Sequence, residues 1–145
     1  MLAEGKWVGT SLRKLIEEDV APATLAQRDR ISLRGEDLFL SPLEALALSM
    51  VLHELLINAL KHGALSTEPG RVLIEWDTDV AGDALRIRWQ ETGGPLLTAP
   101  AAPGTGIDLI IRTINADLRG NVEFAFALDG LCCELCLPLG DTSLR

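Results

Sequence analysis

The stretch from Ser41 to His62 constrains the fold of this chain more than any other feature of its sequence. It opens with Ser-Pro-Leu-Glu, which combines a capping box with a proline at the first helical position, and Gly63 supplies a stop at its end. The residues between are apolar nearly all the way round a helix. Such a helix is buried on most of its sides, so the rest of the chain has to cover it.

Strands are expected on both sides of a second helix. The segments 71–77 and 84–91 alternate apolar and polar residues, which predicts strands with one buried face. Two further strands, 122–128 and 131–137, are joined by Asp129-Gly130, a strong hairpin signal. We also expect a small hairpin in which 30–34 and 37–40 flank Gly35-Glu36.

Two shorter helices complete the pattern. Ser11 is the N-cap of a helix that runs to Glu18, and 107–118 carries an amphipathic stripe that ends at Gly120. Because strands outnumber helices and several are joined by tight turns, the order favours an α+β fold. We expect a two-layer sandwich with helices on one face of a mixed sheet.

The length of 145 residues suits a single domain. We expect 1–20 to be a linker and short helix, 21–140 to form the domain, and 141–145 to be a tail. A net charge of -8 argues against a protein that binds the nucleic-acid backbone. No apolar run of about 20 residues and no charged leader before an apolar stretch are found, which favours a cytoplasmic domain without membrane contact.

The three cysteines all lie on the last predicted strand, at positions 132, 133 and 136. They have no partners elsewhere in the chain, so a disulfide framework is excluded and a reducing compartment is favoured. Their spacing resembles a metal motif only loosely. We expect buried or half-buried thiols rather than a zinc site.

Three polar side chains fall on one stripe of the long helix. Glu54, Asn58 and Lys61 are spaced i, i+4 and i+7, which places them within about 60° of one another, with His62 at the edge. A carboxylate, an amide and an ammonium are costly to bury unless something binds them. Mg²⁺ on a polyphosphate would satisfy all three. The alternative is the solvated face of a surface helix, and the stripe alone does not decide between them.

Glu91 ends its strand with the same parity as the buried-face residues, including Trp89, which we expect in the core. A carboxylate there can accept a hydrogen bond from an exocyclic amine. Gly93 and Gly94 follow, and they would let a flat ring approach the backbone. The alternative is a turn in which Glu91 lies in solvent.

Gly104-Thr105-Gly106 directly precedes a helix start, where backbone N–H groups and the helix dipole favour an anion. The alternative is a flexible loop with a poor cap. A Walker-type phosphate loop is absent, and Leu109 stands where a Rossmann pattern needs its third glycine.

Together the three motifs resemble the ATP-binding domains shared by gyrase, heat-shock ATPases and histidine kinases. Residues 54–62 are similar to the N box, 91–93 to the first glycine box with Glu in place of the usual Asp, and 104–109 to the second. His53 and Trp89-Gln-Glu91 resemble the markers of the HWE family of bacterial sensor histidine kinases. The likeness covers roughly 10–139 and implies a Bergerat-type sandwich.

The resemblance also implies roles at a Mg²⁺-ATP site. Asn58 would ligate Mg²⁺, and Glu54 would help the metal site or act as general base. Lys61 and His62 would contact the phosphates. Glu91 would take the adenine amine, and Gly93 would give the base room.

Further along the chain, Gly104, Thr105 and Gly106 would form the hinge and the phosphate contact of an ATP lid over 96–103. His53 lies about 100° around the helix from Glu54, so we expect it to face elsewhere or to reach only the edge of the site, with a structural or supporting role rather than a ligand's.

As a function, the resemblance implies the catalytic domain of a two-component sensor histidine kinase. It would transfer the ATP γ-phosphate to a histidine on a separate dimerisation domain, which would pass it to a response regulator. The two histidines of this chain, His53 and His62, lie directly before and at the end of the N box, so the acceptor histidine would lie outside this chain. The isolated domain would be a monomer. The alternatives are a stand-alone nucleotide-binding module and an anti-sigma-like serine kinase.

Overall fold

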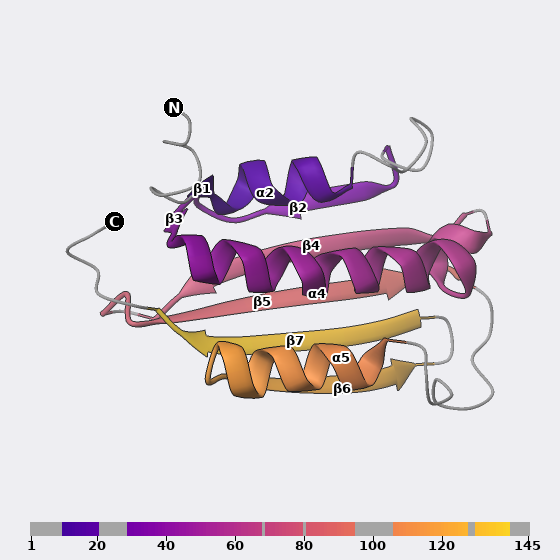
Figure 1. The fold of residues 1–145 in the computed structure, drawn as a ribbon. Coiled ribbons are helices and arrows are strands. Elements are labelled where there is room, and N and C mark those ends of the chain that lie inside the picture. The colour runs from indigo at the N-terminus through magenta and orange to yellow at the C-terminus, as the bar shows by residue number, and fades with distance from the viewer. Residues whose placement is uncertain are drawn as a thin grey trace.

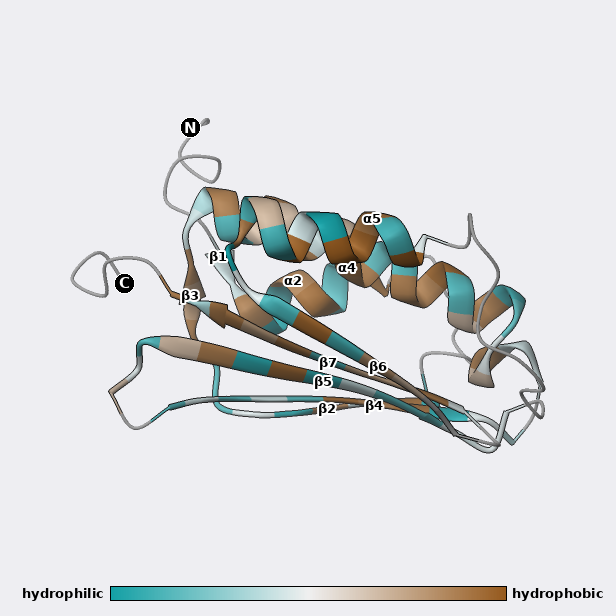
Figure 2. Cartoon of the chain, turned by 90° about the horizontal axis from the view of Figure 1, so that it is seen from below, coloured by the Kyte–Doolittle hydropathy of each residue, from teal (hydrophilic) through white to brown (hydrophobic). Residues whose placement is uncertain are grey.

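The computed structural model describes residues 10–20, 29–67, 69–79, 81–94, 106–127 and 130–139. These residues form two layers: a five-stranded mixed sheet and a layer of helices on one of its faces (Figures 1 and 2). The predicted α+β sandwich is therefore confirmed. The sheet order is β2 (Ile31–Arg34), β4 (Arg71–Thr78), β5 (Ala84–Thr92), β7 (Gly130–Pro138) and β6 (Asn121–Ala127).

The helical layer consists of α2 (Leu12–Asp19), α4 (Pro42–Lys61) and α5 (Ile107–Arg112). The helix predicted over 107–118 is present, but its second half is a π-helical turn, η2 (Thr113–Asp117). A short 3-10 helix, η1 (Ala64–Ser66), follows α4. The linker residues 1–9, the lid residues 96–103 and the tail 141–145 lie outside the described residues.

The four strands read from the sequence are all present, each within one residue of its predicted bounds. β4, β5, β7 and β6 are antiparallel neighbours, and β6 pairs with β7 as predicted. In this register Glu91 lies opposite Val72, while Trp89 lies between Ile74 and Cys133. The apolar residues of the central strands therefore share the face that the helices cover.

The small hairpin predicted around Gly35-Glu36 was wrong. β2 pairs in parallel with β4, whereas β3 (Phe39–Leu40) pairs with β1 (Thr10–Ser11) in a separate two-stranded sheet. An isolated hairpin would have left the apolar side chains of β2 in water, and such hairpins are marginal. Pairing with the longer β4 half-buries Ile31 and Leu33 against the core instead.

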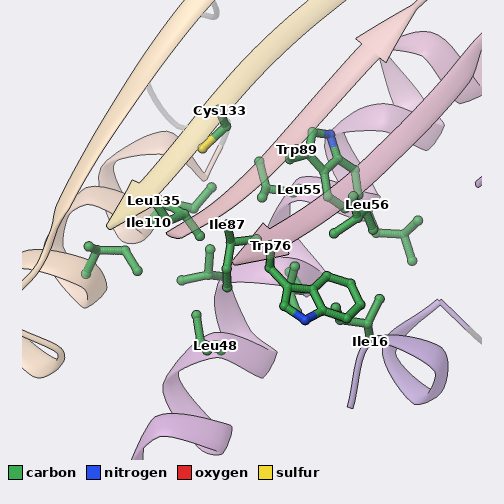
Figure 3. Close-up of a cluster of buried hydrophobic side chains, with 14 of the residues drawn as sticks. Ile16, Leu48, Leu55, Leu56, Trp76, Ile87, Trp89, Ile110, Cys133 and Leu135 are labelled. Carbon is green, nitrogen blue, oxygen red and sulfur yellow. The ribbon is translucent and has the colours of Figure 1, made fainter. Parts of the chain in front are cut away.

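Helix α4 begins and ends as its sequence predicts. The Ser41 hydroxyl accepts a hydrogen bond from the Glu44 N–H at 3.3 Å, and the Glu44 carboxylate accepts one from the Ser41 N–H at 2.9 Å. This capping box satisfies two N–H groups that a helix start leaves unpaired. Leu48, Leu55 and Leu56 then pack into the core with side chains from the sheet (Figure 3).

The opposite side of α4 differs from the expectation of burial on most sides. Leu43, Leu46 and Met50 are exposed. By length and composition α4 could also cross a membrane, with a mean hydropathy of 1.6, although we expected no such segment. One side of α4 is nevertheless buried in the hydrophobic core, as in the core helix of a folded domain.

The predicted short helix is also confirmed as α2, with Ser11 accepting a hydrogen bond from the Lys14 N–H at 3.0 Å. Its residues Leu12 and Ile16 are fully buried in the common core.

The cysteines partly match their prediction. Cys133 is buried and Cys132 half-buried, but Cys136 is exposed. Burial raises the pKa of the Cys133 thiol to about 12. Within the described ranges no group of three or more His, Cys, Asp or Glu side chains could hold a metal ion.

Replacing Leu55 with alanine tests the packing of α4 on the sheet. Leu55 is 1% exposed, so we expect Leu55→Ala to lower the free energy of unfolding by about 2–5 kcal/mol. The matched control is Leu46→Ala on the outer side of the same helix, where Leu46 is 63% exposed and the loss should stay within about 0.5 kcal/mol. Urea denaturation followed by circular dichroism measures both, and equal losses would contradict this packing.

Candidate nucleotide site

The candidate site forms where α4 and β5 end beside one another. The chain leaves α4 through His62 and Gly63 into η1, and there the Ala64 N–H donates to Glu91 Oε1 at 3.0 Å. The other carboxylate oxygen, Glu91 Oε2, accepts a hydrogen bond from the Trp89 indole Nε1–H at 2.9 Å. Glu91 is only 4% exposed. It thus points into the helix layer as its parity predicts, and the alternative with Glu91 in solvent is wrong.

Close backbone approach around Glu91 requires glycine. A Cβ on Gly63 would overlap Glu91 Oε1, and a Cβ on Gly130 would overlap the Glu91 carbonyl oxygen. Gly63 ends the helix as predicted, but with φ at −106° it is not in the left-handed conformation typical of a glycine stop. The space beside the Glu91 carboxylate explains the glycine at this position.

Burial changes the acidity of Glu91. Its removal from water raises the pKa of the carboxyl group, and the hydrogen bonds from Ala64 and Trp89 only partly oppose that shift. The folded chain therefore holds this carboxylate at a cost in stability, which is common among residues that bind a ligand.

The polar stripe of α4 lies on the second side of the site. Glu54 and Asn58 are half-buried, whereas Lys61 and His62 are exposed. Gly106, the one glycine of the second glycine box among the described residues, lies directly against this stripe, because a Cβ there would overlap Glu54 Oε2. Its φ of +93° is left-handed, which favours glycine.

Three motifs that are far apart in sequence therefore meet at one end of the domain. Gly106 touches the start of the α4 stripe, and Glu91 touches the backbone just after the end of that helix. Gly93 has a φ of +71° at the end of β5, and a Cβ on the neighbouring Gly94 would crowd Ala64. Gly104 and Thr105 lie outside the described residues.

His53 faces a different part of the molecule from Glu54, as its position on the helix predicts. It is exposed, and its charge interacts with Asp19 on α2. The Asp19 carboxylate also accepts a hydrogen bond from the Ser49 hydroxyl at 2.9 Å. Burial raises the pKa of Asp19, and His53 and Ser49 partly oppose that shift.

Sequence reasoning missed the residues that hold the loop after α4. The Arg30 guanidinium donates to the carbonyl oxygens of Thr67 at 2.8 Å and Gly70 at 3.0 Å. The Ala64 N–H that binds Glu91 was missed as well. These groups join positions at least 27 residues apart through backbone atoms, which leave no signal in side-chain patterns.

No family model matches the chain. Among curated proteins, it is similar to the blue-light-activated histidine kinase of Brucella anthropi, at 35% identity over 141 residues that cover 96% of this chain and 29% of that protein. The protein of the same name from Brucella ovis is 31% identical over the same shares. The chain thus spans less than a third of the length of these relatives.

Solved structures share the fold. The catalytic domain of the histidine kinase ThkA matches with a TM-score of 0.70 at 18% identity, covering 90% of this chain and 95% of that one. The histidine kinase domain of the blue-light-activated kinase EL346 from Erythrobacter litoralis matches with 0.65 at 15% identity, covering 91% and 59%. The fold is that of a histidine kinase catalytic domain. The sequence relatives show that the chain belongs to the histidine kinase family.

Glu91 makes the stability of the domain depend on pH in a defined direction. Its folded pKa lies above the ordinary value of 4.5, so its contribution to stability is fully present below that pH and is lost as the pH rises through the folded pKa. Glu91→Gln removes this titration. We therefore expect the free energy of unfolding of the wild type minus that of the variant to fall from pH 4.5 upward and then level off. Urea denaturation across a pH series measures it, and a rising difference would contradict the burial of the carboxylate.

Proposed function

We propose that this domain binds Mg²⁺-ATP between Glu91 and the polar stripe of α4, and that it transfers the γ-phosphate to a histidine on a separate domain. The observation that carries the proposal is the buried Glu91 carboxylate of β5, which is bound by the backbone directly after α4. Gly106 lies against Glu54 of the same helix. The markers His53 and Trp89-Gln-Glu91 support assignment to the HWE branch. We also propose that the domain lies in the cytoplasm and that the isolated domain is a monomer.

Glu91 would recognise the base. An ionised carboxylate is an acceptor with about four lone-pair sites, and Ala64 and Trp89 occupy one on each oxygen. The remaining sites can accept the exocyclic amine of adenine. Gly93, at the end of the same strand, would leave room for the flat ring.

The residues of the stripe fit a magnesium ion. Mg²⁺ is usually held by one or two protein oxygens together with water and substrate phosphates, rather than by a cage of side chains. The half-buried amide of Asn58 and carboxylate of Glu54 match that donor set. When bound, the ion would neutralise charge on the phosphates.

Charge at the open end of the site suits the phosphates. Lys61 and His62 are exposed at the end of α4, where they can contact phosphate oxygens. Gly104, Thr105 and Gly106 precede α5, so their backbone N–H groups would close on the phosphate chain. Phosphoryl transfer depends mostly on positioning and charge neutralisation, which such a set supplies. Glu54 would accept the proton of the attacking group as general base.

The partners follow from the same proposal. The acceptor histidine would lie on another domain of the parent chain, and a response regulator would take the phosphate from it. The curated relatives are more than three times as long as this chain, which leaves room for such a domain. A second structure of ThkA, solved in complex with the response regulator TrrA, shares the fold with a TM-score of 0.65.

Asn58 tests the metal role. We expect Asn58→Ala to weaken ATP binding in the presence of Mg²⁺ by at least about tenfold, because the variant loses a ligand oxygen, while binding without Mg²⁺ changes little. The control is Asn115→Ala, at an exposed position in η2 that has no assigned role at the site. Titration calorimetry with and without Mg²⁺ measures both. Unchanged affinity in Asn58→Ala would rule out the metal role.

Phosphotransfer itself can be tested with γ-labelled ATP and a histidine-hairpin domain added as a separate chain. We expect label on the hairpin that is labile to acid and stable to alkali, which is the behaviour of a phosphoramidate. Glu54→Gln should lower the rate, because it cannot accept the proton of the attacking group. Acid-stable label would indicate a serine kinase, and binding without transfer would indicate a nucleotide-binding module.

A further inference from the structure

Trp89 combines two features that rarely serve packing alone. It is 1% exposed and lies in the same buried cluster as Leu55 and Leu56 of α4 (Figure 3). Its indole N–H nevertheless donates to a carboxylate, Glu91 Oε2, two residues further along the same strand. A buried indole needs one hydrogen-bond partner, but a backbone carbonyl would satisfy that need at a lower cost.

The hydrogen bond to Trp89 completes the support of the Glu91 side chain. Ala64 holds Oε1 from the helix side, and Trp89 holds Oε2 from the sheet side, so the plane of the carboxylate is fixed at both oxygens. Glutamate has one more rotatable bond than aspartate, and that bond has to be immobilised before the group can read a base. The Ala64 backbone N–H supplies one of the two hydrogen bonds that do this, and the Trp89 indole N–H supplies the other.

We infer that Trp89 is a positioning residue that orients the Glu91 carboxylate and so sets the preference of the site for an adenine over a guanine nucleotide. The inference rests on the proposed function. At the same position of the ring, adenine carries an amine donor and guanine carries an oxygen acceptor. A fixed carboxylate accepts from the first and repels the second, whereas a carboxylate free to rotate discriminates less.

The same contact keeps Glu91 in its acceptor form. The Trp89 N–H is one of two groups that lower the pKa of Glu91 against the effect of burial. From β7, Cys133 faces Glu91 with a thiol whose pKa is about 12, so it stays neutral near pH 7. Ala64 on η1 contributes a backbone N–H, and Val72 on β4 contributes no charge. Loss of the indole N–H should therefore raise the pKa of Glu91.

Trp89→Phe tests the inference, because it keeps most of the ring and removes the N–H. Its matched control is Trp76→Phe, in which the lost N–H donates to the Glu36 carbonyl oxygen at 2.8 Å, away from the site. We expect Trp89→Phe to bind ATP about tenfold more weakly, as for a lost hydrogen bond to a charged group, with GTP affected less. As the pH is lowered, the ATP affinity of Trp89→Phe should begin to fall at a higher pH than that of the wild type. Trp76→Phe should match the wild type in both respects.

Calorimetry with Mg²⁺-ATP and Mg²⁺-GTP from pH 5.5 to 8.5 measures these effects on the whole chain, alongside Glu91→Gln. If Trp89→Phe has the same preference for ATP over GTP and the same pH profile as Trp76→Phe, while Glu91→Gln no longer binds ATP, the inference is wrong and the proposed function stands. If the wild type binds no ATP, or if Glu91→Gln binds it normally, base reading by Glu91 is wrong and the inference falls with it.

A second measurement does not need a folded variant. In the ¹⁵N spectrum of the wild type, the indole N–H of Trp89 should shift on addition of ATP and with acidification, following Glu91. The indole of Trp76 is the internal reference and should move with neither. An unmoved Trp89 signal in the presence of bound ATP would overturn the inference.

Discussion

The packing of α4 along the sheet is the constraint on which the rest of the domain depends. The helix has 20 residues and β5 has nine, so each spans about 30 Å. Two elements of equal length that lie side by side and run the same way also end together (Figure 1). The apolar side of α4 places the helix along the sheet, because leucines such as Leu48 and Leu55 can be buried only against it. The polar stripe of α4 and Glu91, close to the end of β5, then come together as a consequence of core packing.

Glu91 is the place where that packing departs from the rules that favour stability. Burial raises the pKa of the Glu91 carboxyl group and costs free energy. An apolar residue of similar size would also suit this inward-facing position of the strand. The surrounding structure is nevertheless shaped around the charge. Gly63 leaves space for one oxygen, Ala64 and Trp89 donate to both, and Gly130 admits the backbone. Four residues in three parts of the chain accommodate this group, which is characteristic of a ligand site more than of a core position.

The sequence predicted what depends on neighbours in the chain and failed on what depends on distant partners. The cap at Ser41, the alternation in β4 and β5 and the inward direction of Glu91 follow from local periods, and all three are correct. The hairpin around Gly35 was wrong because a short apolar alternation does not say which strand it pairs with. Parity likewise placed Trp89 in the core but could not reveal its hydrogen bond, since the direction of an indole N–H depends on the packing of the ring. The contacts of Arg30 with backbone carbonyls left no pattern at all.

The two ends of the site differ in how firmly their side chains are held. Both oxygens of Glu91 are fixed by hydrogen bonds, whereas no hydrogen bond to another described residue holds the side chain of Glu54 or Asn58. Rigid groups are useful where recognition precedes chemistry, because their ordering entropy is already lost before the ligand arrives. Groups without such hydrogen bonds are tolerable where a ligand would bring its own metal ion and phosphates to organise them. In the proposed site, the rigid carboxylate would read the base and the half-exposed side chains would contact the phosphates, so the product could leave without disturbing the core.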